Sequence, residues 1–347
     1  MNKMIQKLKV GVIGTGAIAQ NRHIPEYKKN RFVELVGVVD ANVSRAKEVA
    51  HKFYIQHYYQ NVKELIENQD LDIISICTPN HTHKEIAEVC LNKGIHVLCE
   101  KPLSTHYKDA LALIKLAEEK NVFLAVGLNQ RLVPAHNKIK EILDHGDLGK
   151  VYQIKASFGH GGPEHWSVEG EKNWFFDREK SFFGSLGDLG IHKIDLIRWF
   201  LNEEITDVSS LKSTIEKPTY VDDNATVIMK TEGNTLCTVT TSWTYTPWVQ
   251  NELMISCEFG TLLLEQNPDK PGLTILKRDM EETVEVDWLI KEKSGYHHSG
   301  LIHYFVNSVM SKKEPTLISA KTFLGTLKAI FAAEQSAKMK QTICIND

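Results

Sequence analysis

The fold is decided by residues 8–19, which read Leu8-Lys9-Val10-Gly11-Val12-Ile13-Gly14-Thr15-Gly16-Ala17-Ile18-Ala19. The first half is a short, mostly apolar run that predicts a buried strand, and the second half fits the pattern G-x-G-x-x-A. In such a turn, Gly14 permits the tight bend, Gly16 lets a pyrophosphate approach the backbone, and Ala19 keeps the next helix close to the strand. The helix start offers free N–H groups and a partial positive charge to phosphates. The stretch predicts a dinucleotide-binding turn, whose cofactor contacts are Gly14, Gly16, Ala17 and Ile18.

A second apolar run covers residues 33–39 and ends at Asp40. An acid at this distance from the glycines can accept hydrogen bonds from the adenosine ribose. The other interpretation makes Asp40 the N-cap of a helix over residues 43–52, and the two roles are compatible. The carboxylate would repel a 2′-phosphate, so NAD is favoured over NADP. Arg45 is expected either to approach a phosphate of the cofactor or to lie on a solvated helix face.

Strands and helices continue to alternate as far as residue 130. Apolar runs at residues 71–77, 94–101 and 122–128 predict further strands, and residues 107–120 predict a helix. This alternation predicts a parallel, doubly wound sheet in an α/β domain over residues 1–130.

Polar residues follow these strands at the edge where an open α/β sheet contacts its ligand. The stretch Thr78-Pro79-Asn80-His81-Thr82-His83 follows one strand, and Cys99-Glu100-Lys101-Pro102 ends another. A lysine at the end of a buried strand is costly unless it has a function, and Pro102 fixes the backbone just after it. The two histidines have no third ligand nearby, so no metal site is predicted. From these strand ends we predict cofactor contacts by Thr78, Asn80, His83, Glu100, Lys101 and Asn129.

After residue 150 the pattern changes to runs rich in β-forming residues, separated by turns. They predict an α+β domain over residues 131–347, with a large, mostly antiparallel open sheet and a few helices. Helices are expected to cover one face of the sheet. The other face is expected to pack against a second subunit, because an exposed apolar face of that size favours association. A homodimer or homotetramer is therefore predicted.

The loop Gly159-His160-Gly161-Gly162-Pro163-Glu164-His165-Trp166 offers hydrogen-bonding and stacking groups. It either lines a sugar pocket through His160 or is a surface loop packed by Trp166.

Residues 184–195 carry the second chemical signal: Gly184-Ser185-Leu186-Gly187-Asp188-Leu189-Gly190-Ile191-His192-Lys193-Ile194-Asp195. From residue 186 this stretch predicts a helix, on which Asp188 and His192 share one face and Asp195 lies within reach of His192. Glycine costs a helix about 1 kcal/mol relative to alanine, which suggests close approach of cofactor or substrate. The alternative is an acid–histidine pair on a solvated face.

Oxidation of an alcohol by NAD needs a base for the hydroxyl proton and a cation or donor for the oxygen. Histidine has a suitable unperturbed pKa near 6.5. His192 therefore suits the base, and Lys101 suits the oxygen-binding group that relays the proton. Asp188 would orient His192 or bind a neighbouring hydroxyl.

Taken together, the G-x-G-x-x-A turn, the Thr78–His83 stretch, Glu100-Lys101-Pro102 and the Asp188–Asp195 stretch resemble the Gfo/Idh/MocA family. The resemblance covers nearly the whole chain. It implies a Rossmann domain, NAD(P)-dependent oxidation of a sugar, polyol or derivative, and assembly through the open sheet face. Catalytic roles are thereby implied for Lys101, Asp188 and His192.

One departure is that Phe183-Gly184-Ser185 stands where many members have paired glycines. The resemblance also implies that Asn129 and Arg131 lie near nicotinamide and substrate. The substrate contacts predicted in all are Lys101, Arg131, His160, Asp188, His192 and Tyr296, and weaker pocket candidates are Trp174, Arg178 and His297.

Composition excludes several other classes of protein. The 347 residues are 42% hydrophobic and 24% charged, with a net charge of −3, which gives no electrostatic basis for binding nucleic acid or an anionic membrane. Six cysteines without a C-x-x-C pair, and no long apolar segment, predict a cytoplasmic protein with reduced thiols.

The predicted function is an NAD(P)-dependent dehydrogenase that oxidises a secondary alcohol of a polyol or sugar, with an inositol as the leading substrate. The alternatives are an NAD-assisted glycoside hydrolase or coupled sugar oxidoreductase with tightly bound cofactor, and a non-catalytic dinucleotide sensor. A sensor would not need the set Lys101, Asp188 and His192.

Overall fold

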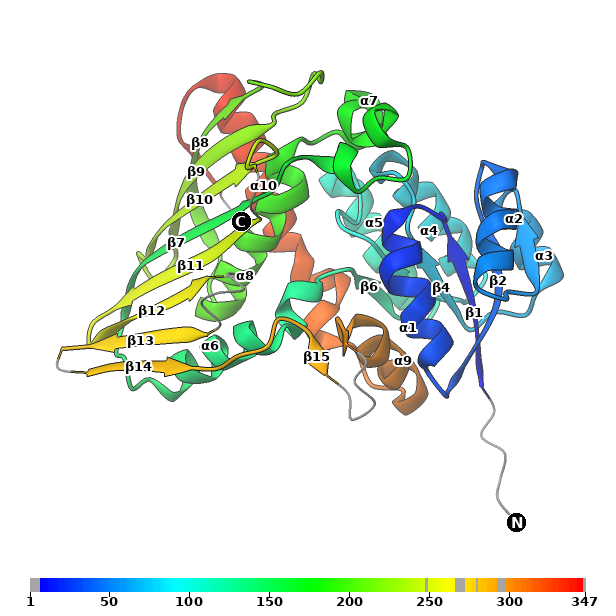
Figure 1. Cartoon of the computed structure of the whole chain (residues 1–347), viewed down its shortest axis with the longest axis horizontal. Helices are drawn as coiled ribbons and strands as arrows, with labels where there is room; N and C mark the ends of the chain where they lie inside the picture. The colour runs from blue at the N-terminus through cyan, green and yellow to red at the C-terminus, as the bar shows by residue number, and fades with distance from the viewer. Residues whose placement is uncertain (1–6, 247–248, 266–271, 279, 292–296, 346–347) are drawn as a thin grey trace, which may run out of the picture. The chain divides into compact units, whose positions relative to one another are not determined.

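The computed structural model describes residues 7–246, 249–265, 272–278, 280–291 and 297–345. They form two compact units (Figure 1). The first contains residues 1–128 and 298–322, and the second contains residues 129–297 and 323–347. Residues 298–322 thus group with the dinucleotide-binding half, although the sequence prediction assigned them to the second domain.

The first unit contains a six-stranded sheet in the order β3-β2-β1-β4-β5-β6, in which every pairing is parallel. Its strands are β1 (Leu8–Ile13), β2 (Val33–Val39), β3 (His57–Tyr59), β4 (Ile73–Ile76), β5 (His96–Cys99) and β6 (Leu124–Val126). The order reverses between β1 and β4, which is where doubly wound sheets bind their ligands. The predicted parallel sheet is confirmed.

Helices connect these strands: a π-helix η1 (Ala19–His23), then α1 (Ile24–Lys29), α2 (Val43–Lys52), α3 (Val62–Asn68), α4 (His83–Asn92) and α5 (Tyr107–Glu119). A 3₁₀ turn, η2 (Asn80–Thr82), precedes α4, and α9 (Leu301–Ser311) packs against α1. Every residue of β4 is completely buried, which explains why three of its four residues are isoleucines.

The second unit contains a nine-stranded sheet in the order β14-β13-β12-β11-β7-β10-β9-β8-β17. Only β7 and β10 pair in parallel among its described pairings, so the predicted mostly antiparallel sheet is confirmed. The strands are β7 (Val151–Gly159), β8 (Ile205–Ser213), β9 (Asn224–Thr231), β10 (Leu236–Ser242), β11 (Gln250–Cys257), β12 (Gly260–Glu265), β13 (Leu273–Lys277), β14 (Met280–Val284) and β17 (Ile343–Cys344).

The remaining elements are the helices η3 (Asn129–Leu132), α6 (Pro134–His145), η4 (Pro163–His165), η5 (Gly170–Lys172), η6 (Trp174–Phe176), α7 (Arg178–Ser181), η7 (Leu186–Gly190), α8 (Ile191–Leu201), η8 (Thr316–Ile318) and α10 (Ala320–Met339), and the short strands β15 (Ile290–Lys291) and β16 (His297–His298). In the part of the chain that is described, no helix combines the length and hydrophobicity needed to cross a membrane. All six cysteines are free thiols.

One face of the large sheet is covered by helices α8 and α10 (Figure 1). Strand β9 shows the alternation: Val227 and Met229 are buried beneath the helices, whereas Ile228 between them is 54% exposed on the other face. We call this second side the open face. Leu211 and Leu236 also lie on it, as the pairing of β8 and β10 with β9 requires.

Helix α8 is buried on nearly all sides and still carries three charged side chains inside the unit. Asp195 pairs with Arg131, and Arg198 pairs with Glu204. Lys193 instead donates to the Asn251 amide oxygen at 2.5 Å, and its ammonium lies 5.7 Å from the centre of the Phe158 ring. Burial lowers the pKa of Lys193 to about 7, although the charge of Glu252 opposes this shift.

We expect Lys193→Met to stabilise the protein most at and below about pH 7. The ordinary pKa of lysine is 10.5, so between about pH 7 and 10.5 the unfolded chain holds a proton that the native chain lacks. The destabilisation by Lys193 is therefore fully present below about pH 7 and fades as the pH rises above it. The stability difference between variant and wild type should shrink by roughly 2 kcal/mol from pH 7 to 9 in urea denaturation.

Lys338→Met is the matched control, because Lys338 is an exposed lysine near the end of α10. It should leave the pH dependence of unfolding unchanged. A stability difference for Lys193→Met that stays constant over this pH range would contradict the assignment.

Candidate active site

The dinucleotide turn joins β1 to η1. Gly14 has φ +89°, and a Cβ atom there would lie 2.5 Å from the carbonyl oxygen of Cys77, so only glycine fits. A Cβ atom at Gly16 would meet nothing within 4 Å. The protein itself therefore does not require glycine at this second position, whereas a pyrophosphate lying against the backbone does. Ala17 and Ile18 are half-buried beside it.

Asp40, at the end of β2, is held by donors from two sides. Its Oδ2 accepts from the Thr15 amide at 2.9 Å and the Thr15 hydroxyl at 2.7 Å. Arg45 donates to both carboxylate oxygens, at 3.1 and 2.9 Å. Burial alone would raise the pKa of Asp40, but the hydrogen bonds from Arg45 and Thr15 lower it. The N-cap of α2 is Asn42 and not Asp40, because the Asn42 side chain accepts from the Arg45 amide.

The segment after β4 is fastened to the segment after β5 by one histidine. His83 is completely buried, and its two ring nitrogens lie 2.7 Å from the carbonyl oxygen of Pro102 and 2.8 Å from that of Thr78. Burial lowers its pKa despite these two hydrogen bonds. The structure thus gives His83 a bracing role, and its predicted contact with a cofactor stays a prediction. Asn80 is buried in the same segment.

Glu100 and Lys101 follow β5 directly. Glu100 is nearly buried, and its carboxylate lies 2.9 Å from Nε2 of His23. Burial would raise the pKa of Glu100, but the hydrogen bond from His23, together with the charges of Arg22 and Lys101, lowers it. Lys101 is half-buried, and the peptide bond between it and Pro102 is cis.

In the second unit, Asp188 and His192 lie one turn apart on η7 and α8. The indole Nε1 of Trp243 donates to Asp188 Oδ2 at 3.2 Å. The His192 ring lies 6.2 Å from the ring of Phe158. Both side chains are half-buried, so they combine fixed neighbours with solvent access.

The glycines around Asp188 have a different cause from the one the sequence suggested. A Cβ atom at Gly184 would lie 1.9 Å from the Asp222 carbonyl oxygen, and one at Gly187 would lie 2.1 Å from the Phe183 side chain. The close approach that the glycines indicated is made by the chain itself at these two positions, so neither glycine needs a cofactor or substrate to explain it.

Arg131 is buried and forms a bidentate ion pair with Asp195, at 2.7 Å for both hydrogen bonds. Thr326 adds a hydrogen bond to the same carboxylate at 2.9 Å. Asp195 therefore forms its ion pair with Arg131, whereas the sequence analysis placed it within reach of His192. The predicted substrate contact of Arg131 stays a prediction, as does the cofactor contact of half-buried Asn129.

Aromatic rings connect the predicted sugar loop to the partner of Asp188. The His160 ring lies 6.3 Å from Trp166, and Trp166 lies 5.0 Å from Phe175. Phe175 stacks on Trp174 at 3.8 Å and lies 6.4 Å from Trp243. The loop is therefore packed through Trp166, and His160 is attached to the same group of rings.

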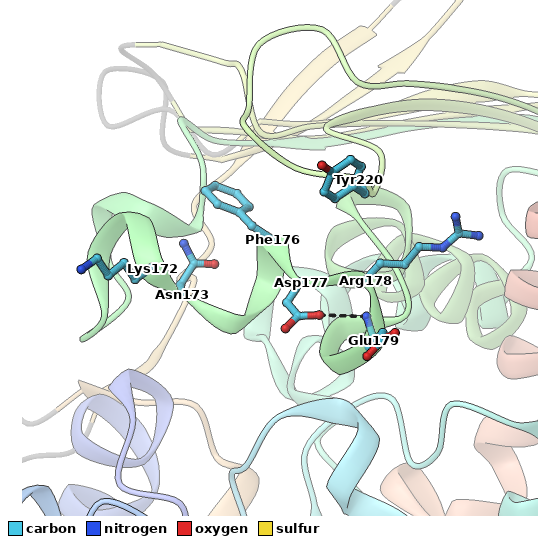
Figure 2. Close-up of a pocket in the computed structure, with 7 residues that line it drawn as sticks. All are labelled: Lys172, Asn173, Phe176, Asp177, Arg178, Glu179 and Tyr220. Atoms are coloured by element: carbon cyan, nitrogen blue, oxygen red, sulfur yellow. Dashed lines mark hydrogen bonds between the residues drawn. The ribbon is translucent and has the colours of Figure 1, made fainter.

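A cavity of about 570 Å³ opens beside this aromatic group (Figure 2). It is lined by Lys172, Asn173, Phe176, Asp177, Arg178, Glu179 and Tyr220. Phe176 lines the cavity and also touches the aromatic group, because it packs with Leu189, Val221 and Trp243 in one buried cluster. Of the weaker pocket candidates, Arg178 lines this cavity, and Figure 2 shows its side chain extending away from Lys172. Asp188 and His192 do not line it.

Tyr296 lies outside the described residues, and His297 is the exposed first residue of β16. Within the described ranges, no group of three or more His, Cys, Asp or Glu residues is arranged to hold a metal ion.

The sequence analysis missed His23 beside Glu100 and Trp243 beside Asp188, and it gave no role to Lys193, which follows His192 in the chain. The contacts of His23 and Trp243 join residues that lie 77 and 55 positions apart, so no local spacing in the sequence predicts them. For Lys193, the signal was a lysine placed in the apolar helix pattern of residues 191–200.

Comparison with known families agrees with this geometry. Residues 8–128 match GFO_IDH_MocA, described as an oxidoreductase family with an NAD-binding Rossmann fold, and residues 136–263 match the GFO/IDH/MocA C-terminal domain. The chain belongs to the Gfo/Idh/MocA oxidoreductase family. The family resemblance read from the sequence is confirmed.

Two Gfo/Idh/MocA relatives illustrate the range of activities. The glucose-6-phosphate 3-dehydrogenase of Bacillus subtilis strain 168 is 33% identical over 67% of this chain and 67% of its own length. The levoglucosan dehydrogenase of Pseudarthrobacter phenanthrenivorans is 28% identical over 60% of this chain and 55% of its own length. The match with the second therefore spans only about half of that relative.

A solved structure of an Agrobacterium radiobacter oxidoreductase in complex with NAD⁺, L-tartaric acid and magnesium shares the fold. Its TM-score is 0.85 at 20% identity, covering 98% of both chains. With its NAD-binding Rossmann domain, this Gfo/Idh/MocA protein uses NAD, as the sequence predicted.

Asp40 and Arg45 give a test of the cofactor contacts. If Asp40 binds the ribose as predicted, loss of its carboxylate removes an acceptor for ribose hydroxyls and a charge that repels a 2′-phosphate. We expect Asp40→Ala to weaken NAD binding about 10- to 100-fold and to lower the preference for NAD over NADP, measured by calorimetric titration.

Arg45→Ala is the companion variant, because it removes the ion-pair partner and leaves the carboxylate in place. NAD binding should change less than in Asp40→Ala. Unchanged NAD affinity in Asp40→Ala would exclude Asp40 from the cofactor site.

Proposed function

We propose that this Gfo/Idh/MocA protein is an NAD-dependent dehydrogenase that oxidises a secondary alcohol of a polyol or sugar to a ketone. The observation that carries the proposal is the pair Asp188 and His192, which have fixed neighbours and remain accessible to solvent. Relatives named as dehydrogenases of glucose 6-phosphate, levoglucosan and myo-inositol support the substrate class.

In the proposed reaction, bound NAD would supply the acceptor for the hydride that leaves the carbinol carbon. His192 takes the hydroxyl proton, a task for which an imidazole is suited near neutral pH. Lys101 donates to the substrate oxygen and stabilises the negative charge that develops there. Asp188 binds a neighbouring hydroxyl or orients His192, and the Trp243 indole keeps its carboxylate in one orientation.

The aromatic group around Trp166 and Phe175 supports a sugar or cyclic polyol as substrate. The flat faces of these rings suit the C–H faces of a sugar ring, and the nearby Asp188 and His160 offer acceptors and donors for hydroxyls. An inositol is the leading candidate within this class, and contacts by Arg131 and Tyr296 belong to the same proposal.

Removal of Lys101 gives the first test of this function. We expect Lys101→Ala and His192→Ala each to lower kcat at least about 10²-fold, because each loses a group that acts on the hydroxyl proton or oxygen. NAD binding should stay within a few-fold of wild type. The measurement is NADH absorbance with a panel of inositols, sugars and sugar phosphates.

Lys108→Ala, at an exposed lysine of α5, is the matched control and should keep wild-type turnover. Wild-type turnover in Lys101→Ala would refute the role of Lys101. NAD that remains bound through purification and cycles without net NADH release would point to a redox-assisted hydrolase or coupled oxidoreductase instead. Absence of turnover with every substrate, despite NAD binding, would favour a dinucleotide sensor.

We also propose that a second copy of the chain covers the open face of the large sheet. Exposed apolar side chains lie on four of its strands: Leu211 at 77%, Ile228 at 54%, Leu236 at 52% and Met254 at 36% exposure. Threonine and serine fill much of the remaining face, which suits close packing of two sheets.

A cytoplasmic location stays a prediction.

Light scattering coupled to size-exclusion chromatography tests the assembly. We expect the wild type to be a dimer or tetramer and Ile228→Glu to be a monomer, because a charge would be buried without a partner. Tyr54→Glu is the control, since Tyr54 is an 88% exposed apolar residue of the first unit. A stable interface would have a nanomolar dissociation constant. A wild type that is still monomeric at a protein concentration about 100 times that value would therefore exclude such an interface.

A further inference from the structure

A chain of four buried polar side chains crosses the first unit. The hydroxyl of Tyr27 lies 2.8 Å from the Ser75 hydroxyl, which lies 3.2 Å from Nδ1 of His23. Nε2 of His23 lies 2.9 Å from a carboxylate oxygen of Glu100. Tyr27, Ser75 and His23 are at most 1% exposed, and Glu100 is 8% exposed.

The hydrogen bonds of this chain can all be satisfied in one direction. Tyr27 donates to Ser75, Ser75 donates to Nδ1 of His23, and Nε2–H donates to the Glu100 carboxylate. This assignment needs only a neutral imidazole and leaves no donor of the chain unused. A fully satisfied buried network is rigid, whereas a partly satisfied one is costly.

Each of the four side chains comes from a different element, so their hydrogen bonds fix four elements to one another. His23 ends the π-helix η1 that follows the Gly14–Ala19 turn, and Tyr27 lies on α1. Ser75 lies in β4, and Glu100 follows β5. A π-helical turn holds one residue more than an α-helical turn and is frequent at functional sites. Here it ends with the His23 ring between Ser75 and Glu100.

The other side of Glu100 is fixed as well. Its second carboxylate oxygen accepts from the Lys101 amide at 3.3 Å. A Cβ atom at Gly127 would lie 2.7 Å from this oxygen, so the carboxylate rests against the backbone of that glycine. Neither oxygen of Glu100 is therefore left to move independently of the backbone that carries Lys101.

We propose that His23 is a positioning residue for Lys101: acting through the Glu100 carboxylate, it fixes the backbone of Lys101 relative to the dinucleotide turn. This inference rests on the proposed function, in which Lys101 binds the substrate oxygen. His23 itself is completely buried, with 0% of its surface exposed to solvent, so it does not contact a ligand directly. Its effect on turnover is indirect, through the placement of a group whose displacement by about 1 Å can cost 10²-fold in rate.

The experiment uses the full chain with four variants: His23→Ala, His23→Gln, Glu100→Gln and the double variant His23→Ala with Glu100→Gln. For each we measure kcat, KM, the Kd of NAD and the midpoint of urea unfolding. We expect His23→Ala to lower kcat about 10²-fold with less than about threefold change in the Kd of NAD. His23→Gln should recover part of kcat, because its amide can still donate to Glu100.

The double variant separates positioning from simple stability. His23→Ala alone leaves a buried carboxylate without its partner, and this cost disappears when Glu100 becomes an uncharged amide. We therefore expect the double variant to recover the unfolding midpoint but to keep the low kcat. If kcat recovers together with stability, or if His23→Ala keeps wild-type kcat, the inference is wrong. If His23→Ala does not fold, Glu100→Gln and the double variant still decide the question.

Tyr27→Phe is the matched control, because it removes the distant hydroxyl and leaves the His23–Glu100 contact intact. It should keep kcat within about threefold of wild type. Lys101→Ala distinguishes the two proposals. Loss of turnover in Lys101→Ala without loss in the His23 and Glu100 variants overturns only this inference, whereas wild-type turnover in Lys101→Ala overturns the role of Lys101 in the proposed function.

Discussion

Burial of the parallel strands on both faces is the constraint on which the first unit depends. Strands β1, β4 and β5 contain few polar side chains, and those few either lie at the amino end of a strand or have a partner inside. Ser75 is the exception within β4, and two hydrogen-bonded neighbours satisfy it. Because polar groups are excluded from the strands, Asp40, Thr78 and Lys101 gather at the edge where the strand order reverses.

Side-chain hydrogen bonds fix the conformation of the loops at that edge. Asp40 is fastened to the dinucleotide turn through Thr15, and His83 fastens the segment after β4 to the one after β5. These contacts use side chains whose pKa values are shifted away from titration near neutral pH: Asp40 downward as an acid, His83 downward as a base. Both shifts favour the deprotonated form, an ionised Asp40 and a neutral His83, and a neutral His83 donates to one of the two carbonyls that face its ring nitrogens.

The second unit uses the opposite arrangement, in which charges lie within the core. Helix α8 carries Lys193, Asp195 and Arg198 on its buried surface, next to His192 in the chain. Asp195 is held by Arg131 and Thr326, so the helix is fixed in rotation as well as in depth. Burial of ions is costly, and removing one partner of a buried ion pair is strongly destabilising, so each of these pairs holds its helix in place. Here the fixed orientation is that of Asp188 and His192.

The sequence by itself determined the parallel sheet, the dinucleotide turn and the family, because each is written in local patterns: G-x-G-x-x-A after an apolar run, polar residues after strands, and alternation in residues 151–286. It also placed Asp188 and His192 on one helical face through their spacing. Only the tertiary structure decided what holds these residues: Trp243 for Asp188, His23 for Glu100, and Arg131 for Asp195. The physical reason is that hydrogen bonds between distant segments depend on how strands and helices pack, and a single sequence contains no spacing that records that packing.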